Sequence, residues 1–158
     1  MATSFERFVQ GYLECAAWAS HDGEHEGLES FEFAPSAILQ AHDDCREFIA
    51  ACGPLIEQAT QYREWGELGH DFFLCSRGHG TGFFDRNMLK DVEPCATVYG
   101  VERWEGACYS TDDTCGHGRG SDSLGDVLSA IAYGTHRAIS RFSAEGCYLG
   151  DDQHIYFL

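Results

Sequence analysis

Basic residues are scarce in this chain, and Lys90 is its only lysine. Its 158 residues include 10 lysines and arginines against 26 aspartates and glutamates, which gives a formal net charge of −16 at pH 7. Non-specific binding to nucleic acid or to anionic membranes depends on basic patches. The composition therefore argues against direct binding to nucleic acid or to a membrane.

Long hydrophobic runs are also missing. No stretch approaches the roughly 20 apolar residues that a transmembrane helix needs. Glu6, Arg7 and Glu14 interrupt the apolar pattern at the N-terminus, so we expect no signal peptide. Without a secretion signal, the eight cysteines are expected to be largely free thiols of a cytoplasmic protein.

The chain does contain enough apolar material for one hydrophobic core. Hydrophobic residues make up 44% of it and aromatic residues 13%. A chain of this length buries about 70% of its unfolded surface on folding, which requires neither disulfides nor metal. We therefore expect residues 1–158 to form a single domain, with residues 88–121 as an irregular insertion within it.

Helical periodicity is present in four segments. Apolar residues recur at spacings of three and four over residues 4–19, 35–52, 55–62 and 123–133. The pair Gly53-Pro54 is expected to end or kink the second helix. The pattern thus predicts a group of N-terminal helices and one later helix.

Two segments have the pattern of β-hairpins. Residues 70–77 and 82–86 are rich in aromatic side chains and flank a glycine-rich turn. Residues 146–158 place the polar stretch 150–153 between two apolar runs. The sequence therefore predicts an α+β fold, in which the N-terminal helices pack on a small antiparallel sheet built from two hairpins.

Residues 69–86, GHDFFLCSRGHGTGFFDR, resemble the core motif of a family of small acidic proteins encoded by tailed phages and prophages. The usual form of that motif has Trp where Phe73 and Phe84 stand here. Further matches to the family lie at residues 11–20, 44–48 and 148–156. The resemblance implies a viral source and a place of action in the host cytoplasm, and it implies no particular activity.

Half of the net negative charge is concentrated in a quarter of the chain. Between Arg7 and Arg46 there are eight acidic residues and no lysine or arginine. We predict that a partner-binding acidic face includes Glu24, Glu26, Glu29, Glu32, Asp43 and Asp44. Such a face can imitate the phosphate rows of DNA, and counterion release then favours binding to a basic groove. The alternative is a solvated surface that serves solubility.

These features together favour a non-enzymatic, phage-type accessory protein. The leading prediction is a DNA mimic that binds a basic surface on a host nucleic-acid-handling or defence protein and inhibits it, which would make it a counter-defence factor. Viral proteins often need to block such host components, and this step depends on the resemblance. We predict no catalytic residue and no cofactor.

The glycine-rich turn supports a first alternative, a small-anion or nucleotide site or a small enzyme. Successive backbone N–H groups beside a guanidinium can hold an anion. The residues of this site would be Arg77, Gly78, His79, Gly80, Thr81, Gly82 and Asp85. The turn lacks the Lys-Ser/Thr pair of a P-loop, and its glycines are also explained by a tight turn alone.

A second alternative is a zinc-ordered structural module. Cys95, Cys108, Cys115 and His117 cluster in the irregular segment and could ligate zinc. Their spacings of 13, 7 and 2 residues are not those of a zinc finger, and no CxxC pair is present. The sequence therefore predicts no definite metal site.

Overall fold

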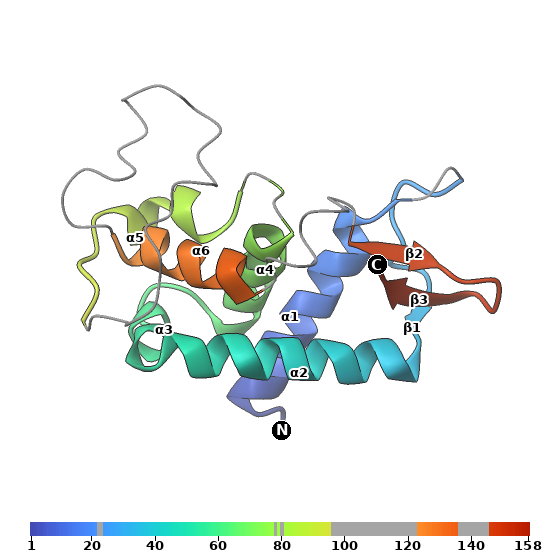
Figure 1. Cartoon of the computed structure of the whole chain (residues 1–158), viewed down its shortest axis with the longest axis horizontal. Coiled ribbons are helices and arrows are strands. Elements are labelled where there is room, and N and C mark those ends of the chain that lie inside the picture. Colours follow the sequence, from blue (N-terminus) through green and yellow to red (C-terminus); the bar gives the residue numbers. More distant parts are fainter. Residues whose placement is uncertain (22–23, 78, 80, 96–122, 136–145) are drawn as a thin grey trace.

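The computed structural model describes residues 1–21, 24–77, 79, 81–95, 123–135 and 146–158 (Figure 1). The elements follow one another as α1 (Ser4–Ala19), β1 (Glu32–Phe33), α2 (Pro35–Cys52), α3 (Pro54–Ala59), α4 (Trp65–Ser76), the 3₁₀ helix η1 (Phe83–Asp85), α5 (Asn87–Lys90), α6 (Leu124–Thr135), β2 (Cys147–Leu149) and β3 (His154–Phe157).

The helices predicted from periodicity are confirmed. Residues 4–19 form α1, and residues 35–52 form α2. Gly53, at φ +53°, separates α2 from α3, as the pair Gly53-Pro54 predicts. The later helix is α6. Of the predicted irregular insertion, residues 96–121 lie outside the described residues.

Helices α1 and α4 pack closely because glycines face each other between them. A side chain on Gly11 would overlap the carbonyl oxygen of Gly66, and one on Gly69 would overlap the carbonyl oxygen of Phe8. The absence of a Cβ at these positions lets the two backbones approach. This contact sets the position of α4 against the rest of the core.

Four fully buried phenylalanines join α1, α2, α4 and η1. The rings of Phe48 and Phe72 stack at a centroid distance of 4.1 Å and an angle of 11°. The rings of Phe8 and Phe83 belong to the same cluster, with centroids 6.0 Å and 5.7 Å from that of Phe48. Offset aromatic stacking of this kind stabilises a core beyond the burial of apolar area.

The sheet has three strands in the order β1-β3-β2. Strands β2 and β3 are antiparallel and pair Tyr148 with Tyr156, so the predicted C-terminal hairpin is confirmed. Strand β1 runs parallel to β3 and pairs Phe33 with Ile155. The sheet lies beside the C-terminal end of α1 and the N-terminal end of α2, away from α3, α5 and α6 (Figure 1).

The prediction of a sheet built from two antiparallel hairpins is wrong. Residues 65–76 form α4 and residues 83–85 form η1, so the first hairpin does not exist. Every residue of the second half of α4, residues 71–76, is buried, because other elements surround this part of the helix. This half of the helix has no exposed polar face, and its short aromatic run therefore resembles a strand.

Candidate functional site

Apolar residues hold the acidic segment, residues 24–33 between α1 and α2, on the body of the protein. Leu28 is fully buried, and its backbone N–H donates to the carbonyl oxygen of Ala17 in the last turn of α1 at 3.0 Å. Phe31 and Phe33 are half-buried against the core, and Phe33 pairs with Ile155 in the sheet. The segment therefore has a defined position at the sheet end of the molecule (Figure 1).

Four of the predicted acidic residues are exposed on this segment, because its apolar residues point inward. They are Glu24, Glu26, Glu29 and Glu32. We call these four residues the acidic loop, and its last member, Glu32, is also the first residue of β1. No lysine or arginine lies between Arg7 and Arg46 in the sequence.

The other two predicted acidic residues, on α2, differ from the acidic loop. Asp43 is exposed, but it forms an ion pair with Arg46, in which its Oδ1 lies 3.0 Å from Nη1 of the arginine. Asp44 is half-buried, and burial raises the pKa of its carboxyl from 3.8 to about 6 while the nearby Arg77 charge opposes the rise. Neighbours on a helix point about 100° apart, so Asp43 and Asp44 do not share one surface.

A groove that the sequence analysis missed lies between α1, α2 and the segment leading into β1. It has a volume of about 400 Å³. Its α1 wall consists of Glu6, Val9, Gln10, Leu13, Glu14 and Ala17. These positions recur at helical spacing and form a second stripe beside the stripe that packs on α4. Glu29, Phe31, Phe33 and His42 complete the lining.

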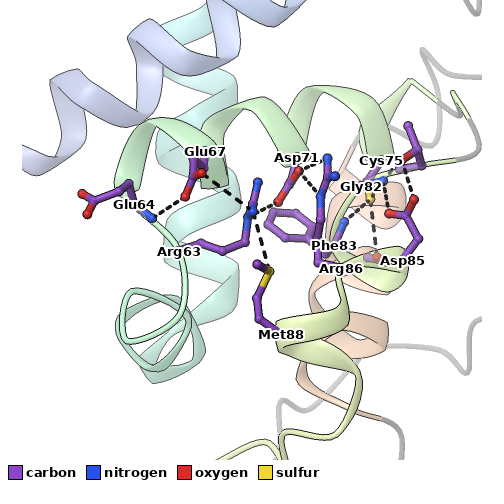
Figure 2. Close-up of polar contacts among 12 residues, drawn as sticks. Arg63, Glu64, Glu67, Asp71, Cys75, Gly82, Phe83, Asp85, Arg86 and Met88 are labelled. Carbon is purple, nitrogen blue, oxygen red and sulfur yellow. Dashed lines mark hydrogen bonds and ion pairs between the residues drawn. The ribbon is translucent and has the colours of Figure 1, made fainter.

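The glycine-rich turn already holds a carboxylate of the protein itself. Asp85 accepts hydrogen bonds from the hydroxyl of Thr81 at 2.6 Å and from the backbone N–H of Gly82 at 2.8 Å (Figure 2). An external anion at these two donors would have to displace Asp85. Gly78 and Gly80 lie outside the described residues.

The side chain of Arg77 is buried rather than presented to solvent at the turn, with 1% of its surface exposed. Its guanidinium lies over the rings of Phe73 and Phe157, at 5.9 Å and 5.4 Å from their centroids. Nη1 donates to the carbonyl oxygen of Leu158 at 3.5 Å. Burial, with the Arg77 charge as a second cause, lowers the pKa of His79. Arg77 therefore joins the end of α4 to β3.

Asp71 on α4 is a second buried charged residue, and the sequence analysis did not identify its ion-pair partners. Its Oδ2 lies 2.7 Å from Nε of Arg63, and its Oδ1 lies 2.7 Å from Nη2 of Arg86 (Figure 2). Burial raises the pKa of the Asp71 carboxyl, and both guanidinium groups oppose that rise. The carboxylate thus ties α4 to the segments before α4 and after η1.

The cysteines of the described residues are free thiols, and all of them except Cys95 are buried. Burial raises the pKa of Cys15 and Cys75 to about 12 and that of Cys147 to about 11. The backbone N–H of Phe83 donates to Sγ of Cys75 at 3.3 Å. Thiols with raised pKa values are poor nucleophiles at neutral pH, so these cysteines act as core residues.

Of the four candidate zinc ligands, the structure describes Cys95 alone. Cys95 is exposed, and its thiol donates to the carbonyl oxygen of Pro54 at 3.9 Å. Cys108, Cys115 and His117 lie outside the described residues. Over the parts of the chain that the structure describes, no three His, Cys, Asp or Glu side chains are arranged to hold a metal ion.

Comparison with models of protein families, with curated proteins and with solved structures finds no significant match for the chain. Among the helices of the described residues, none is both long and apolar enough to cross a bilayer.

Proposed function

We propose that the protein is a non-enzymatic accessory protein of phage type, which binds a host protein through the acidic loop and inhibits it. The partner is a nucleic-acid-handling or defence protein with a basic surface, where the carboxylates take the place of nucleic-acid phosphates. One observation carries the proposal: the acidic loop exposes four carboxylates on a segment that Leu28 anchors to the core.

Electrostatics supports this choice of partner. The chain carries a net charge of −16, and the acidic loop adds its carboxylates where the sequence supplies no lysine or arginine. The field of exposed charges acts over a Debye length of about 8–10 Å at moderate salt. A basic surface is attracted into that field, and anionic membranes and free nucleic acid are repelled by it.

Three ionisable groups, of which Asp71 and Arg77 are buried, are engaged within the fold, which favours binding over catalysis. Asp71 is occupied by two arginines, and Arg77 is occupied by two aromatic rings and a carbonyl oxygen. Asp85 caps the turn that contains Thr81 and Gly82. Each of these groups is engaged in holding elements of the fold together.

Capture of partners from a host lysate, followed by purification of the protein captured, tests the proposal. In the test variant, lysine replaces every residue of the acidic loop. In the control variant, lysine replaces the exposed residues Glu47, Glu57, Asp91 and Glu93, which lie away from the sheet and give the same change of net charge. The wild type and the control variant should retain a basic partner that the loop variant loses.

Competition with duplex DNA tests the mimicry itself. If the acidic loop occupies the nucleic-acid site of its partner, increasing DNA should displace the protein from the purified complex, and the protein should inhibit the partner's DNA binding. Stable simultaneous binding of DNA and the protein would contradict the mimicry.

A further inference from the structure

We infer that the groove between α1, α2 and residues 29–33 binds an apolar side chain of a basic partner, with flanking arginine or lysine residues held by its acidic rim. This inference rests on the proposed function and adds the chemistry that the partner presents. The acidic loop would attract the basic partner, and the groove would recognise its apolar side chain.

The floor of the groove is apolar. Val9 and Ala17 of α1 are 3% and 5% exposed and form its base, with Leu13 between them along the helix. Phe31 and Phe33 form the facing wall and are themselves half-buried. A volume of about 400 Å³ lies at the small end of ligand sites, which suits one large side chain with part of its backbone.

The rim of the groove is acidic. Glu6, Glu14 and Glu29 line it, and neither lysine nor arginine is among the lining residues. Glu6 accepts a hydrogen bond from the N–H of Thr3, and Glu14 accepts one from Nε2 of Gln10. Each carboxylate has about four acceptor positions, so most of them are available to a guanidinium or ammonium group.

Charge complementarity selects a cationic protein segment as the occupant. A second copy of this chain also carries a net charge of −16, so the carboxylates of the rim would repel it. The rim would repel an anionic lipid surface for the same reason. The acidic loop contributes Glu29 directly to the rim, so the region that attracts a basic partner is continuous with the groove. Interfaces of this kind concentrate affinity in one apolar anchor surrounded by polar contacts.

Short synthetic peptides test this inference without a known partner. The probe is Arg-Arg-Phe-Arg-Arg, with both ends blocked. The first control peptide replaces Phe with Ala, and the second replaces every Arg with Glu. Affinity is measured by titration, and the site is located by NMR from the methyl signals of Val9 and Leu13. The Phe peptide should bind about tenfold or more tightly than the Ala peptide, and it alone should shift these methyl signals.

Two sets of variants separate the apolar and the charged contributions. Leu13→Glu adds negative charge to the groove, so general attraction should increase while the preference for Phe over Ala is lost. Glu14→Gln with Glu29→Gln should weaken binding of both arginine peptides about three- to tenfold. The matched control, Glu47→Gln with Glu57→Gln, changes the net charge equally and should have a much smaller effect, with circular dichroism verifying that every variant folds.

Several results would overturn the inference. Equal binding of the Phe and Ala peptides, without methyl shifts, would refute the groove while leaving the acidic loop as the binding surface. Equal binding of the glutamate peptide would refute the selection by charge. Binding of phenethylammonium as tight as that of the Phe peptide would assign the groove to a small amine. Groove binding of the Phe peptide by the wild type, together with capture of host proteins that reversal of the acidic loop does not change, would support the groove and contradict the proposed function.

Discussion

The backbone N–H of Leu28 donates to the carbonyl oxygen of Ala17 at 3.0 Å. Ala17 lies in the last turn of α1, where helix carbonyl groups lack partners within the helix. The acidic segment thus caps the helix that also supplies one wall of the groove. The position of the acidic loop is therefore coupled to the stability of α1 through Leu28.

Replacing Leu28 with alanine should lower the free energy of unfolding by about 2–5 kcal/mol, since the side chain is fully buried. Hydrogen exchange at the amides of Leu28 and Phe31 should accelerate more than exchange in α4. The control is Leu39→Ala, at a side chain that is 67% exposed, and it should change stability by less than about 0.5 kcal/mol. Equal effects of the two substitutions in urea unfolding would contradict the anchoring.

The close contact of α1 with α4 predicts opposite effects of alanine at two glycines of α4. Gly69→Ala would place a methyl group against the carbonyl oxygen of Phe8 and should cost about 1–3 kcal/mol. At Gly66 the nearest atom would be 3.7 Å away, so Gly66→Ala should be neutral or stabilising by up to about 1 kcal/mol. Thermal and urea unfolding measure both, and a tolerated Gly69→Ala would refute the close approach.

Removal of the Asp71 carboxylate should destabilise the fold far more than removal of a surface carboxylate. Asp71→Ala leaves Arg63 and Arg86 without their shared partner and should cost about 3–5 kcal/mol. Asp43→Ala breaks only the exposed pair with Arg46 and should cost about 1 kcal/mol or less. A cost at Asp71 as small as that at Asp43 would show that the buried pairs do not support the fold.

Asp44 should make stability depend on pH. Burial raises the pKa of Asp44 from 3.8 to about 6, so the folded protein binds this proton more tightly than the unfolded chain. The contribution of Asp44 is therefore most favourable below about pH 4 and is lost as the pH rises through about 6. The stability of Asp44→Asn relative to wild type should increase by about 1–2 kcal/mol over this interval, after allowance for partial exposure.

Urea unfolding from pH 4 to pH 8 measures that difference, with Asp43→Asn as the control on the neighbouring exposed residue. The control difference should change much less over the same range. A constant difference between Asp44→Asn and wild type would contradict the inward placement of Asp44.

The helices α1 and α2 were predictable because each has one buried and one exposed face, so that apolar residues recur at helical spacing. Helix α4 was not predictable from the sequence, because four successive residues are buried and leave no exposed polar face. These residues are Asp71, Phe72, Phe73 and Leu74. The partners of Asp71 come from positions eight residues before it and fifteen after it, and no spacing rule connects them.

The site was partly predictable for a similar reason. The concentration of acidic residues between Arg7 and Arg46 indicated that the side chains of the acidic loop would form an exposed acidic face. The inward position of Asp44 depends on the rotation of α2 against Arg77, which sequence alone does not define. The groove had a sequence signal, the second stripe through Val9 and Leu13, but its facing wall comes from Phe31 and Phe33 on another segment.

The proposed function depends on the attraction of a basic partner by the acidic loop. The test is the association rate constant with the purified partner between about 50 and 300 mM salt. It is measured by stopped flow for wild type, for the acidic-loop variant with lysine at all four loop positions, and for the control variant of equal charge, which we call the remote variant. Wild type and the remote variant should lose association rate steeply as salt increases, because screening shortens the field. The acidic-loop variant should associate slowly, with a flatter salt dependence. Identical salt dependence in the two variants would contradict the claim and leave the acidity as a general property of the surface.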